Sequence, residues 1–160
     1  MINPPRPQNY GYAHRDKTVE ALQANLCDLI DLTLQGKQAH WNVIGAQFRS
    51  VHLELDEIIA SVRASSDAVA ERIATLGRSP DGRAKVVGEK SRLERFPQGL
   101  QSAASIVTIY SDRLAAAIGG LRKSIASVGK HDPVSEDLLI GVAGTLEKHL
   151  WMLQSQELAQ

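Results

Sequence analysis

The stretch FRSVHLELDEIIASVRASSDAVAERIATLG, residues 48–77, decides both the fold of this chain and the place of its chemistry. We predict that it forms one long helix with two pairs of possible metal ligands, His52 with Asp56 and Asp67 with Glu71. The members of each pair are four residues apart, so they stand one turn apart on the same helix face. At about 100° per residue, the four side chains fall within an arc of roughly 100°. They form a single stripe of imidazole and carboxylate groups.

The two pairs cannot hold the same metal ion within one chain. Asp56 and Asp67 are eleven residues apart, which is ~16 Å along a helix axis, whereas metal–ligand bonds are only about 2.0–2.6 Å long. A twofold axis crossing the helix between Ser61 and Val62 would lay the first pair of one subunit against the second pair of its mate. The residues there are mostly small, and Arg63 must point aside. Helix geometry thus predicts two identical metal sites between the subunits of a dimer.

The composition is that of a single globular domain. With 160 residues, of which 43% are hydrophobic and 22% charged, the chain is long enough for one substantial core. The formal net charge of zero gives no general reason to expect binding to nucleic acid or to an anionic membrane. The lone Cys27 argues against a disulfide scaffold and suits a reducing compartment. Because we find no signal-peptide pattern and no apolar run of ~18 residues, we expect a cytoplasmic protein without a membrane partner.

Helical patterns account for most of the chain after residues 1–17, which we expect to form a flexible N-terminal tail. The spacing of apolar residues predicts four long helices, and Thr18 is the expected N-cap of the first. Their expected bounds are about Thr18–Val43, Phe48–Leu76, Leu100–Val128 and Pro133–Glu157.

The connection between the second and third of these helices is long. Glycine and proline residues mark about residues 77–99 as a loop. A link of this length is unusual in a compact bundle unless it crosses the bundle end, and we expect a short helix around Ser91–Phe96 within it. No stretch shows the alternation typical of a β-strand. Four long helices with one long crossover favour an all-α, ferritin-like four-helix bundle formed by residues 18–160.

Five short motifs at fixed spacing resemble the signature of one protein family. They are QAHWNVIG at residues 38–45, Phe-x-x-Val-His-x-x-Leu-Asp at 48–56, Asp-x-Val-Ala-Glu-Arg-Ile-x-x-Leu-Gly at 67–77, Asp-x-x-Ser-Glu-Asp-Leu-Leu at 132–139 and Lys-His-Leu-Trp-Met at 148–152. The family is Dps, the DNA-binding proteins from starved cells, which are ferritin-like miniferritins of bacteria. The resemblance covers most of the chain after the tail.

The resemblance implies a hollow homododecamer that oxidises Fe²⁺, preferentially with hydrogen peroxide, and stores the ferric product in the bacterial cytosol or nucleoid. It also implies a ferroxidase centre at a twofold interface, the arrangement that helix geometry predicts independently. The family's first-helix histidine falls on His40, and its second-helix histidine and aspartate fall on His52 and Asp56. The acidic pair of the neighbouring subunit falls on Asp67 and Glu71.

This ligand set suits Fe²⁺, which takes oxygen and nitrogen ligands, although the same groups would accept zinc or manganese. We expect Asp56 and Glu71 to bind or bridge iron, with at most two ions at each site. The sequence argues against an ordinary ferritin centre inside each subunit, because no histidine here follows a glutamate by three residues. The alternative is that these five residues only form a polar face in contact with solvent. That alternative requires the face to be exposed to water, because buried carboxylates without partners cost several kcal/mol.

Other residues are candidates for supporting roles. Trp41 lies beside the family-type histidine and could intercept stray oxidising equivalents as a radical trap. The family has acidic pores at threefold axes through which iron enters, and Asp132, Glu136 and Asp137 lie in the matching stretch. The acids at the start of the last helix could equally serve only to stabilise the helix N-terminus.

DNA binding is the open function. The tail region offers Arg6, Arg15 and Lys17 against Asp16, and many copies in one assembly could turn weak phosphate contacts into avidity. The alternative to a ferroxidase is therefore an architectural protein that binds DNA and compacts the nucleoid, with a vestigial metal site. A helical interaction module without metal has no positive support in the sequence.

Overall fold

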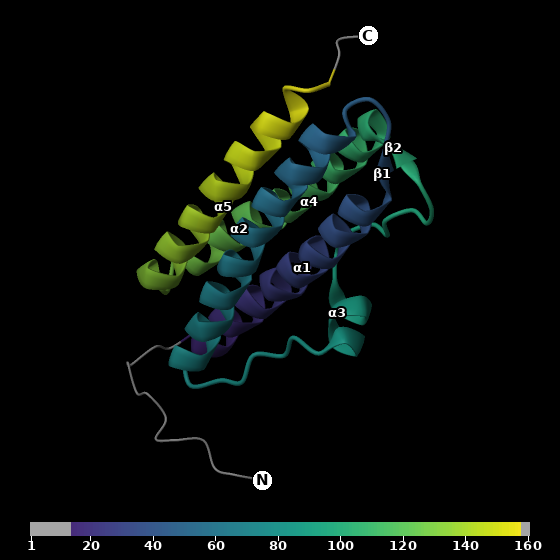
Figure 1. The fold of residues 1–160 in the computed structure, drawn as a ribbon. Coiled ribbons are helices and arrows are strands. Elements are labelled where there is room, and N and C mark those ends of the chain that lie inside the picture. Colours follow the sequence, from purple (N-terminus) through teal and green to yellow (C-terminus); the bar gives the residue numbers. More distant parts are fainter. Residues whose placement is uncertain (1–13, 158–160) are drawn as a thin grey trace.

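The computed structural model describes residues 14–157 of the chain. Four long helices lie side by side in it (Figure 1): α1 (Arg15–Asn42), α2 (Phe48–Thr75), α4 (Ala103–Val128) and α5 (Pro133–Gln154). Each helix has two neighbours around the bundle, because α1 and α5 both pack against α2 and against α4. The predicted all-α four-helix bundle is confirmed.

Aliphatic side chains from all four helices fill the space between them. The largest fully buried ones include Leu22, Leu29, Leu32, Leu55, Ile58, Ile73, Ile106, Leu114, Leu121 and Leu139. Burying one such side chain stabilises the fold by about 1.5–3 kcal/mol, so these core residues together supply most of the driving force for folding. Tyr110 is also fully buried, and its hydroxyl donates a hydrogen bond to the carbonyl of Leu32 at 3.0 Å. Burial also raises the pKa of Tyr110 far above its ordinary value.

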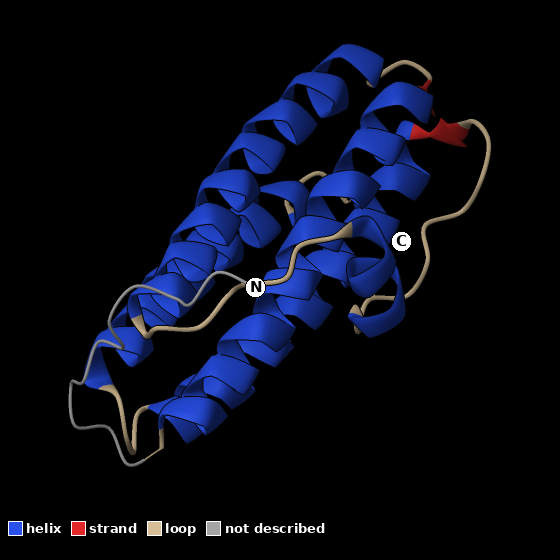
Figure 2. Ribbon diagram, turned by 90° about the horizontal axis from the view of Figure 1, so that it is seen from below, coloured by secondary structure: helices blue, strands red, loops and turns tan. Residues whose placement is uncertain are grey.

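The crossover from α2 to α4 runs along the outside of the bundle from one end to the other (Figure 2). It contains the short helix α3 (Ala84–Lys90), which packs against α1. The prediction of a short helix in the crossover is confirmed, but its place at Ser91–Phe96 was wrong. Ser91 and Arg92 instead follow the helix as loop residues that contact α1, where the Ser91 hydroxyl donates to Asp31 at 2.5 Å and Arg92 donates to Asp28.

Two short strands pair where the crossover reaches α4, although the sequence predicts no strand. Strand β1 (Val43–Ile44) pairs in parallel with β2 (Gln101–Ser102), just before α4 begins. Two residues are too few to show a periodic pattern, so the sequence gives no signal for this pairing. Among the described residues, no helix combines the length and the apolar character that crossing a membrane requires.

The first helix begins earlier than predicted. Its N-cap is His14 rather than Thr18, and the side chain of Thr18 is buried inside the helix instead of capping it. In this extra turn, Asp16 forms an ion pair of 2.6 Å with Arg78, which lies just after the end of α2. The prediction of a flexible tail over residues 1–17 is wrong for Arg15–Lys17, which are helical, and residues 1–13 lie outside the described residues.

Candidate metal centre

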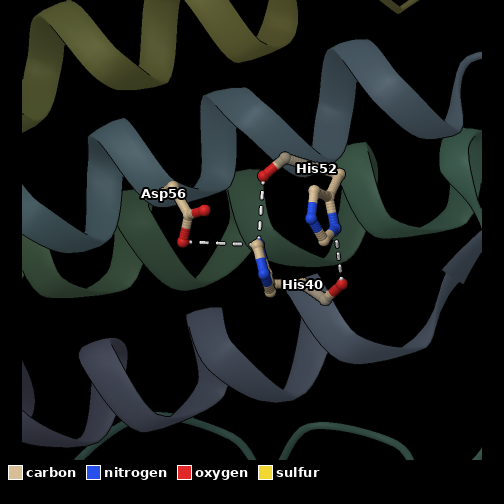
Figure 3. Close-up of side chains that lie close together, drawn as sticks. All are labelled: His40, His52 and Asp56. Atoms are coloured by element: carbon tan, nitrogen blue, oxygen red, sulfur yellow. Dashed lines mark hydrogen bonds and ion pairs between the residues drawn. The ribbon is translucent and has the colours of Figure 1, made fainter.

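Three of the predicted ligands meet where α1 packs against α2. Gly45 adopts a φ of 111° between these helices, a conformation that favours glycine, and lets the chain reverse within a few residues. The reversal places His40, near the end of α1, beside His52 and Asp56, in the first turns of α2 (Figure 3). One ligand atom from each of the three lies within 4.8 Å of the others. We call this group the histidine half-site.

Backbone carbonyls orient both imidazole rings. Nδ1 of His40 lies 3.1 Å from the carbonyl oxygen of His52, and Nδ1 of His52 lies 3.0 Å from the carbonyl oxygen of His40. A carbonyl can only accept, so each Nδ1 acts as the donor, which leaves Nε2 as the ring atom that could bind a metal. The two rings stack with their centroids 3.6 Å apart. This reciprocal arrangement fixes the orientation of both rings.

Asp56 already has a cationic partner. Nζ of Lys37 lies 2.6 Å from one of its carboxylate oxygens, and Nδ1 of His40 lies 3.4 Å from the same oxygen. The hydrogen bond from Lys37 is the main reason why the pKa of Asp56 lies below its ordinary value. The carboxylate is therefore ionised and able to bind a cation. Sequence reasoning missed Lys37, whose only signal was its position one turn before His40.

Asp67 and Glu71, the acidic half-site, lie further along α2 and are both exposed. Within the described residues, the group of possible ligands that forms around His40 does not include them. Asp67 instead borders a groove of about 560 Å³ between α1, α2 and the start of the crossover. Its apolar lining includes Leu26, Ile30 and Ala70. A single chain thus presents two separate half-sites on one face of the bundle.

The predicted pore residues have different surroundings. Asp132 is the N-cap of α5, is buried, and binds the guanidinium of Arg72 at 2.9 Å and the hydroxyl of Ser135 at 2.6 Å. Partial burial raises its pKa, but these hydrogen bonds outweigh burial and lower it. Asp132 therefore joins α2 to α5 as a structural group. Glu136 is half-buried and Asp137 exposed, and a role for the three in a pore stays a prediction.

The remaining candidates lie apart from the histidine half-site or at its edge. Trp41 follows His40 at the end of α1 and is 70% exposed. Arg15 and Lys17 lie in the first turn of α1, at the opposite end of that helix. Arg6 lies outside the described residues. Radical trapping by Trp41 and DNA binding by the three cations stay predictions.

The bundle with its metal-ligand cluster matches a known class of proteins. The family model of the ferritin-like domain matches residues 19–157, so the chain belongs to the ferritin-like proteins. Within that class it is a member of the Dps family. The DNA protection during starvation protein of Mycolicibacterium smegmatis is 36% identical over 136 residues, which are 85% of this chain and 74% of the relative.

Two further matches show the range of the family. The fine tangled pili major subunit of Haemophilus ducreyi is 38% identical over 136 residues, which are 85% of this chain and 72% of the relative. The solved structure of Dps from Microbacterium arborescens in the high iron form has a TM-score of 0.84 and 26% identity, and the match covers 97% of each chain.

Proposed function

We propose that this protein is a ferroxidase and iron store. It forms a hollow dodecamer that oxidises Fe²⁺, preferentially with hydrogen peroxide, and keeps the ferric product inside, which protects DNA from oxidative damage. The observation that carries the proposal is the meeting of His40, His52 and Asp56, with ligand atoms within 4.8 Å of one another. Similarity to a Dps structure in a high iron form supports iron as the metal substrate.

The centre is completed by a second subunit. Asp67 and Glu71 lie on the same helix as Asp56 but ~16 Å or more further along it, beyond the reach of a shared ion. An antiparallel pairing of two α2 helices brings the acidic half-site of one subunit to the histidine half-site of the other, and it does so twice. The groove beside Asp67, lined by polar as well as apolar side chains, supplies a surface on which the partner packs.

The chemistry needs two neighbouring iron ions and a peroxide. Each Fe²⁺ loses one electron, the O–O bond of hydrogen peroxide breaks, and the two oxygens take up two electrons and two protons to give two water molecules. Because both electrons are available together, no hydroxyl radical is released. The imidazoles of His40 and His52 leave iron open positions for peroxide, and the carboxylates of Asp56 and Glu71 balance the charge of the ferric product.

The test is anaerobic loading with Fe²⁺ followed by stoichiometric hydrogen peroxide. Ferric absorbance and hydroxyl-radical trapping are followed together in the wild type and in His52→Ala, Asp56→Asn and Glu71→Gln. We expect fast oxidation with little radical in the wild type. Each variant should lose at least about 10-fold in rate, as perturbed metal sites do.

A neighbouring acid provides the matched control. Glu57→Gln makes the same chemical change as Glu71→Gln at an exposed position of the same helix that belongs to neither half-site. It should oxidise iron at the wild-type rate, and size-exclusion chromatography should show the same assembly for all variants. Wild-type rates in well-assembled Asp56→Asn or Glu71→Gln would contradict the proposal.

A further inference from the structure

Phe48 stands beside one of the proposed metal ligands. It is the first residue of α2, and its backbone N–H donates a hydrogen bond to the carbonyl of Gly45 at 3.0 Å. The helix places Phe48 one turn before His52, so the two side chains share a face. Their ring centroids lie 4.9 Å apart, with an angle of 33° between the ring planes. Aromatic rings at this distance attract each other.

Packing of the bundle does not account for this aromatic side chain. Phe48 is 42% exposed, whereas the large side chains of α2 that fill the core, such as Leu55 and Ile58, are fully buried. Among the described residues, the ring that Phe48 contacts is that of His52. The position of Phe48 is therefore better explained by its contact with the histidine than by the core.

His52 is the histidine of the half-site that most needs support. It is half-buried, whereas His40 is only 8% exposed. A single hydrogen bond, from Nδ1 to the carbonyl of His40, orients the His52 ring. The His40 ring stacks on it at 3.6 Å, and with Phe48 there are three rings whose planes differ from that of His52 by 24° and 33°. Rotation of the His52 ring would push its edge into one of these neighbours.

We propose that Phe48 is a positioning residue for the metal centre. Its ring holds the His52 imidazole in the orientation in which Nδ1 donates to the carbonyl of His40 and Nε2 is left for iron. Phe48 acts through His52, since its own side chain offers no ligand atom. The inference rests on the proposed ferroxidase function, but the orientation of the ring can be measured without any metal.

The first measurement is the tautomer of His52 in the full-length, metal-free protein. Solid-state NMR of protein with isotope-labelled histidine, at about pH 8 where histidine is ordinarily neutral, distinguishes a protonated Nδ1 from a protonated Nε2. His52→Gln identifies the signals of this residue. We expect the Nδ1–H form in the wild type. Phe48→Leu and Phe48→Met keep apolar bulk without the ring, and both should give a mixture of the two forms, because a neutral imidazole can carry its proton on either nitrogen.

The second measurement is the affinity for Fe²⁺ in an anaerobic titration, followed by the dependence of the oxidation rate on Fe²⁺ concentration. We expect Phe48→Leu to weaken Fe²⁺ binding and to raise the KM for Fe²⁺ by about 2- to 10-fold, which is what one aromatic contact is worth. The kcat should stay within about 2-fold of the wild-type value, because the ligands themselves are unchanged.

Two further variants are the controls. Phe48→Tyr keeps the aromatic ring and should keep the wild-type tautomer and Fe²⁺ affinity. Leu53 is 45% exposed on the same helix, but it borders a groove with Trp151 and Met152 of α5. Leu53→Ala removes more apolar surface than Phe48→Leu and should leave both readouts unchanged. Size-exclusion chromatography should show the same assembly for all variants.

The outcomes separate this inference from the ferroxidase proposal. Slow iron oxidation by the wild type would contradict the ferroxidase function, yet the metal-free spectra would still decide whether Phe48 orients His52. Loss of the pure Nδ1–H form in Phe48→Leu and Phe48→Met, with the wild-type form in Phe48→Tyr, supports the inference. An unchanged tautomer in the assembled Phe48→Leu and Phe48→Met would overturn it, even with weaker Fe²⁺ binding. An equal effect of Leu53→Ala would overturn it as well.

Discussion

At the scale of single residues, the proposed metal centre depends on hydrogen bonds between its histidines and the backbone as well as on the identity of its ligands. The reciprocal contacts of His40 and His52 with each other's backbone carbonyls fix which ring nitrogen is free. The three residues that meet here, His40, His52 and Asp56, could be predicted from helix spacing and from the family motifs. Their orientation could not, because it depends on how closely α1 and α2 approach.

Lys37 is the residue that most directly opposes cation binding at this centre. Its ammonium lies 2.6 Å from a carboxylate oxygen of Asp56, where it occupies a position that a metal ion would use. We predict that Lys37→Gln binds Fe²⁺ about 2- to 5-fold more tightly, as expected for loss of one partly exposed ion pair. Anaerobic Fe²⁺ titration measures this directly. Lys37→Arg keeps the charge and should stay near the wild-type affinity, and an unchanged affinity in Lys37→Gln would refute this role.

At the scale of elements, the long helices were predictable and the connections were not. Four periodic stretches, each of more than twenty residues, give enough repeats to identify a helix and its buried face. The start of α1 at Arg15 and the position of α3 depend on distant contacts, such as Asp16 with Arg78 and Arg92 with Asp28. Such tertiary contacts override local preference and leave no local signal.

The packing of α1 against α4 gives a prediction about glycine. An ideal Cβ at Gly36 would lie 2.7 Å from the hydroxyl oxygen of Tyr110 and 2.8 Å from Cγ1 of Ile59. Gly36→Ala should therefore destabilise the protein by about 1–3 kcal/mol through overpacking. Gly119→Ala is the control, because that position has open space and should gain about 0.5–1 kcal/mol of helix propensity. Denaturant unfolding compares the two, and equal effects would contradict the close approach at Gly36.

The turn between α4 and α5 gives a prediction about pH. Desolvation and the charges of His14, Lys17 and Lys130 lower the pKa of His131 in the folded protein. As the pH falls through about 6.5, the unfolded chain therefore takes up a proton before the folded protein does, and stability decreases. His149, whose pKa is also lowered, acts in the same direction.

Replacing the histidine should remove part of this loss. We predict that His131→Gln loses less stability than the wild type between neutral and mildly acidic pH. Part of the dependence of stability on pH remains in this variant, because His149 still contributes to it. The denaturant midpoint measured at several pH values is the readout. Identical pH profiles for the variant and the wild type would show that His131 does not titrate in this way.

At the scale of the whole molecule, the face formed by α1 and α2 is unfinished in a single chain. It carries both half-sites, and Leu34 and Trp41 remain 56% and 70% exposed on α1. Large exposed apolar side chains next to polar groups are typical of surfaces that another protein covers. The proposed twofold pairing of α2 follows from residue spacing alone, whereas the groove beside Asp67 could not be predicted, because it depends on the path of the crossover.

The central claim is that each iron centre takes ligands from two subunits, and subunit mixing tests it most directly. Asp56→Asn and Glu71→Gln chains, each expected to be inactive alone, are co-expressed so that they assemble together. In a mixed dimer, one centre combines both mutations and the other combines intact Asp56 with intact Glu71. We predict that random mixing restores about a quarter of the wild-type ferroxidase activity. A mixed assembly as inactive as its two parents would contradict the account, because centres built within one subunit could never be repaired in this way.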